Sequence, residues 1–373
     1  MYPTRKLSEL ASIKNGKSNA DEAIDNWAYA FFDRSKKIKR SSRFLFDCEA
    51  LIIPWEWAEF LPRYYSWKFD LHQRAYAIHD FSSDINVFYL EYFLIHTKKY
   101  FEDVAVGATV KSLRMRHFED LEIPLPPLST QLAIVARLDS AMSEIDEARR
   151  QVESALASVR EVWESTLESV FVGGGEWWEE KRLREIATFR NWMNFTKWSK
   201  WEKLKIVGVK DFQKNFWIPF ENLESVIIDG KLNEIDILKK GDILAVRSNG
   251  NPALIGRTIL AWPTWDNICH SGFTIRIRIN RESISPVYLC HFLKTQKAKS
   301  ELIESGTGIN IKSLNQQALS ILLIPFPPLP EQSRIVAHLD AVRAETESLE
   351  RLYREKLASL DELRRSVLAE AFL

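Results

Sequence analysis

The stretch Ile123–Asp139 reads IPLPPLSTQLAIVARLD, and Ile324–Asp340 reads IPFPPLPEQSRIVAHLD. The two align without gaps at an offset of 201 residues (324 − 123), with 11 of 17 positions identical. Unrelated segments would agree at roughly one position in twenty, so the match indicates an internal duplication. The same offset continues downstream, where Leu156-Ala157-Ser158 matches Leu357-Ala358-Ser359.

Matching segments also precede the two copies, but at other offsets. Leu7–Ala11 resembles Leu183–Ala187 at an offset of 176, and Tyr89-Leu90 resembles Tyr288-Leu289 at an offset of 199. Gly107 with Lys111-Ser112-Leu113 resembles Gly306 with Lys312-Ser313-Leu314. The second copy is therefore about 25 residues longer (201 − 176) in its upstream part. This pattern favours a shared scaffold that carries two divergent domains, here called heads.

A long helix is predicted after each Pro-rich segment. From Leu138 to Val170, the apolar residues follow steps of three, four or seven, which is typical of a coiled-coil seam. Gly173-Gly174-Gly175 is expected to end the first helix, and the second is expected to run to the C-terminus. About 40 residues of helix are roughly 60 Å long, and neither helix could bury such a stripe alone. A pseudo-two-fold relation between the copies predicts antiparallel pairing, with two independent surface helices as the alternative.

The expected fold class is α+β, with two mixed α/β heads and two long helices in an antiparallel coiled coil. The predicted boundaries are residues 1–126 for the first head, 127–172 for the first helix, 173–327 for the second head and 328–373 for the second helix. Strands are expected near Leu204–Val209, Gly241–Val246 and Gly256–Ala261, with a turn at Asp229-Gly230.

Composition excludes several classes of protein. The chain has 373 residues, 51 basic and 51 acidic, so it is no polycation, although segregated charge still permits DNA binding. Its three cysteines, Cys48, Cys269 and Cys290, form no CxxC pair, which favours buried free thiols. The N-terminus has no apolar h-region and no run approaches 18 apolar residues, so we expect a soluble, cytoplasmic protein.

The loop Arg247-Ser248-Asn249-Gly250-Asn251 carries the side chains that read bases in the DNA major groove. Arg pairs with guanine through two hydrogen bonds and Asn does the same with adenine. Glycine allows the backbone to approach closely. Composition alone leaves an ordinary hairpin loop open as the alternative.

Basic residues are clustered in both heads. The first has a run of Arg34, Lys36, Lys37, Lys39, Arg40 and Arg43, and residues 181–214 of the second contain ten basic and three acidic residues, Lys210 among the basic ones. Trp192, Phe195, Trp198 and Trp201 are interleaved with this second run. The predicted roles are phosphate contact for the cations and, as the alternative, a solvated surface with core aromatics.

These features together resemble a type I restriction-modification specificity subunit, and the resemblance covers essentially the full chain. It rests on the pair of PxPPLxxQxxIVxxLD segments, each preceded by Lys-Ser-Leu and followed by a long helix. Gly241–Gly256 is similar to the family's "GDIL…R.NG…IG" stretch. Lys68, His72, Arg74 and Tyr76 fall on a "KF..H.R.Y" stretch common in such domains, whereas Leu51–Trp57 replaces the Arg/Asn/Gly loop in the first head.

The resemblance implies a non-catalytic subunit that binds double-stranded DNA at a bipartite, asymmetric site. It also implies two methyltransferase subunits docked on the scaffold, restriction subunits joined to them, and no membrane. No cofactor is expected in this chain; S-adenosylmethionine is expected in the partner methyltransferase subunit. The candidate DNA-binding residues are Lys36, Lys39, Arg40, Lys68, His72, Arg74, Lys111, Lys210, Arg247, Ser248, Asn249, Asn251 and Lys312.

The sequence lacks the common motifs of catalytic and nucleotide-binding sites. The sequence has no GxGxxG after a strand, no GxxxxGK[ST] and no HExxH, and Asn251-Pro252 lacks the rest of an NPPY-like motif. These absences predict neither a catalytic residue nor a metal ligand. Two alternatives stay open: a stand-alone DNA-modifying or DNA-cleaving enzyme, and a coiled-coil assembly protein without DNA contact.

Overall fold

The computed structural model describes residues 2–19, 28–33, 35, 37–54, 60–107, 111–172, 178–191, 202–213, 215–228, 234–261, 268–304 and 313–372. The predicted turn at Asp229-Gly230 and the residues Arg34, Lys36 and Lys312 lie outside these ranges, as do Trp192, Phe195, Trp198 and Trp201.

The chain divides into two compact units. Unit 1 is Met1–Ser154 with Tyr353–Leu373, and unit 2 is Ala155–Leu352. Each unit therefore contains one head and a part of each long helix. The long helices are thus divided between the two units.

The head of unit 1 is built on two four-stranded sheets. The main sheet has the order β2-β9-β6-β7, and its strands pair antiparallel. The second sheet has the order β4-β3-β8-β5, in which β3 and β8 run parallel. The strands are β2 (Ser12–Asn15), β3 (Tyr29–Phe32), β4 (Lys39–Ser41), β5 (Phe46–Asp47), β6 (Ala50–Pro54), β7 (Arg63–Tyr65), β8 (Lys68–Leu71) and β9 (Ala75–His79).

The head of unit 2 repeats this topology except for β5, which has no counterpart among its described strands. Its main sheet has the order β12-β18-β15-β16, and its second sheet has the order β14-β13-β17, again with one parallel pair, β13 and β17. The strands are β12 (Ala187–Asn191), β13 (Glu202–Val207), β14 (Glu224–Ile228), β15 (Ile243–Val246), β16 (Thr258–Leu260), β17 (Ile268–His270) and β18 (Thr274–Ile279). The duplication predicted from the scaffold thus extends to the strand order of the heads.

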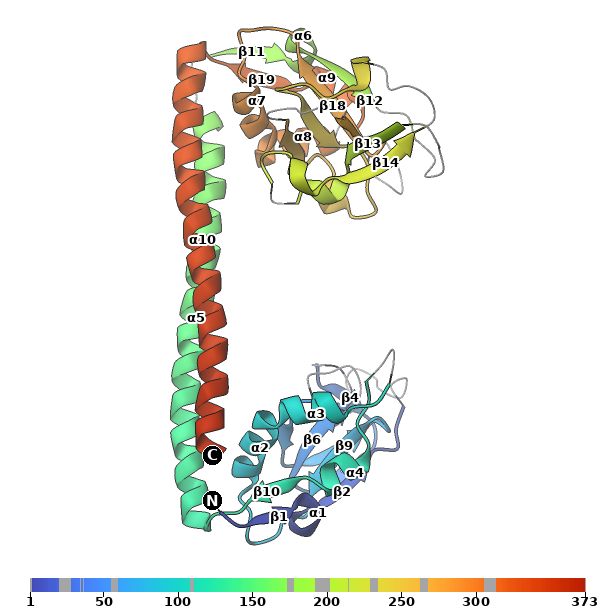
Figure 1. Ribbon diagram of the computed structural model, residues 1–373, viewed down its shortest axis with the longest axis vertical. Helices are drawn as coiled ribbons and strands as arrows, with labels where there is room; N and C mark the ends of the chain where they lie inside the picture. The colour runs from blue at the N-terminus through green and yellow to red at the C-terminus, as the bar shows by residue number, and fades with distance from the viewer. Residues whose placement is uncertain are drawn as a thin grey trace. The chain divides into compact units, whose positions relative to one another are not determined.

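Short helices cover the main sheets on the side that faces the long helices (Figure 1). In unit 1, α2 (Val87–His96) packs there, and in unit 2, α7 (Pro286–Leu293) does. The other helices are α1 (Leu7–Leu10), α3 (Lys98–Val104), α4 (Met115–Glu119), α6 (Leu183–Ile186), α8 (Gln296–Glu304) and α9 (Gln316–Ile321). Short 3-10 turns include η2 (Val209–Asp211) and η5 (Pro252–Leu254).

A two-stranded antiparallel pair joins the two ends of each head next to a long helix. In unit 1, β1 (Thr4–Lys6) pairs with β10 (Glu122–Pro124), and in unit 2, β11 (Glu179–Arg182) pairs with β19 (Leu323–Phe326). The Pro-rich segments overlap the ends of these strands, since Pro124 belongs to β10 and Pro325 to β19.

The long helices are α5 (Leu128–Val172) and α10 (Leu329–Phe372). They pair antiparallel: in unit 1, Arg149 is bonded to Asp361 and Arg364 Nη1 lies 2.8 Å from Asp146 Oδ1. In unit 2, Arg160 lies 3.6 Å from Glu350. The apolar positions predicted for the seam are buried at Leu138, Met142, Ile145, Val152, Val159 and Leu167. The predicted fold class, mixed α/β heads on an antiparallel helix pair, is confirmed.

A buried glutamine fixes the start of each long helix to its head. Gln131 and Gln332 are both fully buried. Gln332 Oε1 accepts from the Ser285 amide at 2.8 Å, and its Nε2 donates to the carbonyls of Ser283 at 3.0 Å and Pro327 at 2.8 Å. Gln131 makes the same three kinds of bond, to Asn86, Asp84 and Pro126. Each head is thereby oriented on its helix by a polar side chain whose hydrogen bonds leave little freedom.

Candidate nucleic-acid interface

The loop Arg247–Asn251 begins where β15 leaves the main sheet of unit 2. All residues of β15 are buried, whereas Arg247, Ser248 and Asn249 are partly exposed and Asn251 is exposed. Asn249 Oδ1 accepts from the Asn251 amide at 2.8 Å, and Asn251 Oδ1 accepts from the Ala253 amide at 3.0 Å. The two asparagines therefore shape the loop through local side-chain turns.

Two other segments hold this loop in place. The amides of Arg247 and Ser248 both donate to the Phe273 carbonyl, at 2.7 and 3.4 Å, and Arg247 itself accepts from the Leu314 amide at 2.8 Å. Leu314 follows the Lys-Ser pair at 312–313, of which Lys312 lies outside the described residues. The structure thus brings the predicted loop next to the end of the second predicted segment.

Phe273 was not among the candidate residues predicted from the sequence. It occupies the turn between β17 and β18, and 58% of its surface is exposed, which is unusual for a phenylalanine. The only signal was a glycine, Gly272, between two apolar runs. An exposed aromatic ring beside Arg247 provides an apolar contact of the kind that thymine methyl groups and unstacked bases accept.

The corresponding turn of the first head contains His72 and Arg74. The amides of His72 and Ser271 donate to equivalent carbonyls, those of Phe32 and Val207, both at 2.9 Å. Arg74 therefore stands where the second head has Phe273. His72 is buried, and its Nδ1 accepts from the Arg74 amide at 3.0 Å, so His72 positions the turn while Arg74 is exposed.

Two features close to this turn were not predicted from the sequence: a close approach of the chain at Gly16 and a hydrogen-bond network around Asp70. The chain passes so near at Gly16 that a Cβ there would lie 2.0 Å from the Leu71 carbonyl oxygen, so only glycine fits. Buried Asp70 accepts from Ser18 Oγ at 2.7 Å and from Ser41 Oγ at 2.8 Å, and Arg43 Nε lies 3.6 Å from it. These bonds fix the end of β8 just before the turn.

The cations predicted in the first head have partners. Lys39 in β4 lies 2.8 Å from Asp33, and Lys68 lies 3.6 Å from Asp47 and over the Phe44 ring. Burial opposes ionisation of Asp33, but hydrogen bonds from Lys39 and Ser35 outweigh it and lower the pKa of that carboxyl. Exposed Arg40 donates to the Ala28 carbonyl at 3.5 Å, and Lys111 donates to the Glu102 carbonyl at 3.0 Å.

In the second head, several cations of the basic run bind carboxylates of the same unit. Lys210 lies 2.6 Å from Glu224, and Arg190 is bonded to Asp236. Arg278, outside that run, is bonded to buried Asp242 through both Nε and Nη2, each at 2.7 Å. The positive charge available to a phosphate is therefore smaller than the sequence count indicates.

The part of the chain that the structure describes offers no group of three or more His, Cys, Asp or Glu side chains suited to a metal ion. Cys48, Cys269 and Cys290 are free thiols, the last two buried and the first half-buried. No helix within the described ranges combines the length and apolar character required to cross a membrane.

Comparison with known proteins identifies one family model that matches the chain twice. Residues 2–154 and 175–357 match the family model described as "Type I restriction modification DNA specificity domain". The type I restriction enzyme EcoDI specificity subunit of Escherichia coli is 23% identical, over 100% of this chain and 88% of the relative. The EcoKI specificity subunit of Escherichia coli (strain K12) is 22% identical, over 72% of this chain and 61% of the relative.

Solved structures share the fold. One, described as the structural basis of complex assembly and conformational transition of the type I R-M system, superposes with a TM-score of 0.72 at 18% identity, covering 100% of this chain and 97% of that chain. The HsdS subunit from Thermoanaerobacter tengcongensis gives a TM-score of 0.52 at 20% identity, covering 100% and 96%. With the family model matching both repeats, the chain belongs to the family of type I restriction-modification DNA specificity proteins.

Proposed function

We propose that this chain recognises a bipartite, asymmetric sequence in double-stranded DNA, with one half-site read by each head. The observation that carries this proposal is the pair of equivalent turns in two heads of equal topology. One turn presents Arg74 and the other presents Phe273 beside Arg247. Equal scaffolds with different side chains at one edge favour two different half-sites rather than a palindrome.

Arg247 is the residue we assign to base recognition in the second half-site. Its backbone is fixed on both sides, by the Phe273 carbonyl and by the Leu314 amide, so its side chain starts from a defined position. A guanidinium donates to guanine O6 and N7 together. Ser248, Asn249 and Asn251 are assigned to the same edge, where the asparagine Nδ2 groups can donate while Oδ1 shapes the loop.

Phosphate contact is assigned to the exposed cations Arg40 and Lys111 and, from the sequence alone, to Lys312, which lies outside the described residues. Lys39, Lys68 and Lys210 are weaker candidates, because their carboxylate partners would compete with the phosphate. Arg74 is assigned to the first half-site.

The partners we propose are two methyltransferase subunits on the helix pair, with restriction subunits joined to them. The family relation supports this, since the relatives are specificity subunits of type I restriction enzymes. The chemistry of methyl transfer would then belong to the methyltransferase subunit, which would hold S-adenosylmethionine, and this chain would be non-catalytic.

Selection from a random duplex library tests the proposal. The chain, bound to its methyltransferase partner, should enrich two short sequence blocks separated by a spacer of fixed length. Affinity should fall steeply with salt, since phosphate contacts release counterions. One contiguous block, a palindrome or no enrichment would contradict the proposal.

A further inference from the structure

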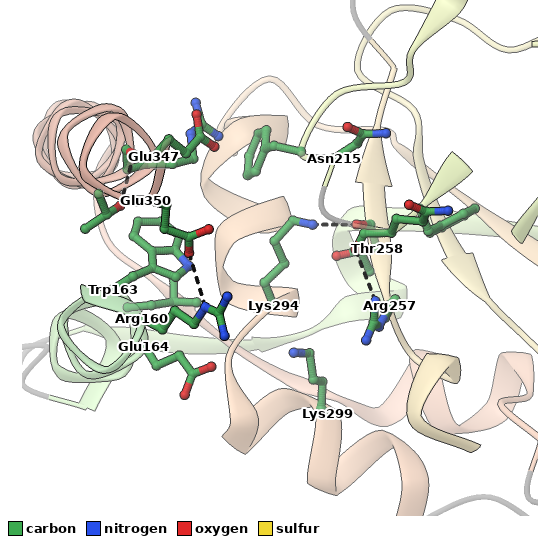
Figure 2. A pocket seen from close by; sticks show the side chains of 16 residues that line it. Arg160, Trp163, Glu164, Asn215, Arg257, Thr258, Lys294, Lys299, Glu347 and Glu350 are labelled. Atoms are coloured by element: carbon green, nitrogen blue, oxygen red, sulfur yellow. Dashed lines mark hydrogen bonds and ion pairs between the residues drawn. The ribbon is translucent and has the colours of Figure 1, made fainter. Parts of the chain in front are cut away.

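Unit 2 contains a cavity of about 550 Å³ between the head and its portions of the long helices. One wall consists of Arg257, Thr258, Lys294 and Lys299 from the head. Residues of α5 and α10 form the opposite wall, among them Arg160, Trp163, Glu164, Glu347 and Glu350 (Figure 2). This volume falls within the usual range for small-molecule sites.

The head contributes three cations to the cavity, and none of them has a carboxylate within 4.0 Å among the described residues. Arg257 donates to the carbonyls of Ala253 at 3.2 Å and Gln213 at 3.1 Å. Lys294 donates to the Thr258 carbonyl at 2.6 Å, and its Nζ lies 5.4 Å from the centre of the Phe216 ring. Three positive charges therefore share one wall without a directly bonded carboxylate.

The acidic residues across the cavity compensate this wall only in part, since Glu164 and Glu168 of α5 attract Lys299 without bonding to it. Glu350 lies 3.6 Å from Arg160, and Arg343 lies 2.9 Å from Asp340 and over the Phe216 ring. Arg343 Nη1 is buried and makes no hydrogen bond within the described part of the chain. A buried guanidinium nitrogen that lacks an acceptor is costly unless a ligand supplies one.

The first repeat provides an internal comparison. Tyr89 and Tyr288, 199 residues apart, donate to the equivalent carbonyls of Pro124 and Pro325. At the same offset Ile95 corresponds to Lys294, and at the scaffold offset of 201 Met142 and Ile145 correspond to Arg343 and Thr346. In unit 1 these three residues pack in one apolar cluster, whereas in unit 2 their counterparts line the cavity.

The apolar packing at the equivalent positions of unit 1 argues against a packing defect of the shared scaffold as the cause of the cavity in unit 2. The duplicated scaffold can fill this position with apolar side chains, as unit 1 does. In unit 2, charged or polar groups stand at all three positions and face open volume. Three neighbouring cations that are only partly exposed repel one another, so their combination here favours an anionic ligand.

We propose that this cavity of unit 2 binds a small anion of the phosphate class, held by Arg257, Lys294 and Lys299 of the head and by Arg343 of α10. Such an anion accepts several charge-assisted hydrogen bonds at once, which matches three donors that converge from one wall. The remaining volume admits an organic group attached to the phosphate. The site is independent of the DNA-reading loop, and it does not rest on the proposed function.

The protonation of the two lysines supports this assignment. Burial lowers the pKa of Lys294 and of Lys299, and the neighbouring positive charge of Arg257 lowers both further. A bound anion would counteract that effect and favour the protonated amines. Binding is therefore expected to take up protons at alkaline pH.

Calorimetric titration of the full chain with pyrophosphate, in a phosphate-free chloride buffer, tests the site directly. We expect saturable binding with one site per chain, and heats that depend on the ionisation enthalpy of the buffer at pH 9. A nucleoside diphosphate that binds more tightly than pyrophosphate would identify a nucleotide-type ligand, and equal affinities would identify the bare anion. Failure of both to bind at millimolar concentration would overturn the proposal.

Variants that copy the first repeat make the test specific. Lys294→Ile and Arg343→Met introduce the residues found at the equivalent positions of unit 1, so the scaffold is known to accept them. Each should weaken pyrophosphate binding about tenfold or more, since each removes a charged donor. Lys297→Ala removes an exposed lysine of α8 that does not line the cavity, and it should change nothing.

Thermal unfolding and pyrophosphate affinity, measured on each variant, separate poor folding from a loss of binding. Arg343→Met also removes the partner of Asp340, so thermal unfolding of both variants without ligand is needed to separate a loss of stability from a loss of binding. Unchanged pyrophosphate affinity in both Lys294→Ile and Arg343→Met would overturn the proposal. An equal loss in Lys297→Ala would do the same, because it would indicate nonspecific attraction to surface charge.

Discussion

The carbonyl oxygen of Arg247 accepts a hydrogen bond from the amide of Leu314 at 2.8 Å, although 67 residues separate the two in sequence (314 − 247). This bond joins the polar loop after β15 to the segment that precedes α9. The Phe273 carbonyl binds the same loop from the other side. The side chain of Arg247 thus projects from a backbone that three separate segments define.

Arg247→Ala should relax the sequence requirement in one half-site only. A lost pair of hydrogen bonds to guanine costs about 1–3 kcal/mol of discrimination. Binding of the methyltransferase complex to duplexes substituted at each position would measure it. An equal loss of affinity for every duplex would instead identify Arg247 as a phosphate contact.

Phe273→Ala should weaken DNA binding without unfolding the chain. The ring is mostly exposed, so the change in the free energy of unfolding should stay within about 0.5 kcal/mol. Loss of an apolar or stacking contact should reduce DNA affinity by about 1–3 kcal/mol. Denaturant unfolding and DNA titration give the two values; unaltered DNA affinity would remove Phe273 from the interface.

The two long helices could be predicted because the sequence patterns that indicate them each lie within a short stretch of the chain. The 17-residue repeat and the apolar spacing lie within single helices, and they suffice to predict both α5 and α10. The topology of the heads could not be obtained in this way, since β12 pairs with β18 almost 90 residues later and β13 pairs parallel with β17.

The candidate site was predicted only in part, for the same reason. The composition of Arg247–Asn251 indicated DNA contact, but the neighbouring Phe273 belongs to a turn whose position depends on the sheet. The ion pairs Lys39–Asp33 and Lys210–Glu224 could not be foreseen from a count of basic residues. Sequence composition identifies which residues are suited to bind DNA, and the fold decides which remain available.

Gln332→Ala should destabilise unit 2 by about 3 kcal/mol. The substitution leaves the partly buried Ser285 amide and two carbonyls without their partners. Guanidinium unfolding of the full chain would measure the change. Exposed Gln317→Ala is the matched control, with an expected change within about 0.5 kcal/mol; similar values for the two variants would show that Gln332 does not fix the head to α10.

Unit 2 should lose stability as the pH falls below 6.5. Burial lowers the pKa of His270 to about 3, and the positive charge of Arg276 adds to this effect. The unfolded chain takes up a proton near pH 6.5 and the native His270 does not, so its contribution is present above that pH and declines as pH falls toward 3.

His270→Asn should make the pH dependence less steep between pH 4.5 and 6.5. The expected difference in slope is about 1.4 kcal/mol per pH unit, the value for one proton. Asparagine retains a polar atom that can bond to Thr274, which lies 2.9 Å from His270 Nδ1. The exposed His338→Asn variant serves as the control, and the same slope in both variants would assign the pH dependence to other groups.

Removal of one heptad from each long helix should change the DNA spacer and not the half-sites. In unit 1, Arg149 faces Asp361 and Asp146 faces Arg364, so residues 147–153 and 357–363 are facing segments. One heptad is about 10 Å of helix, the rise of about three base pairs. Altered half-site letters would contradict a pure spacing role for the helices.

The central claim, that this chain determines a two-part DNA sequence, is tested most directly by sequencing methylated bases in a methylation-free host. The chain would be expressed together with its methyltransferase partner, and the partner alone would be the control. We predict an asymmetric motif of two blocks that is modified only when this chain is present. The same motif without this chain, or no motif with a verified complex, would contradict the claim that this chain determines the DNA sequence.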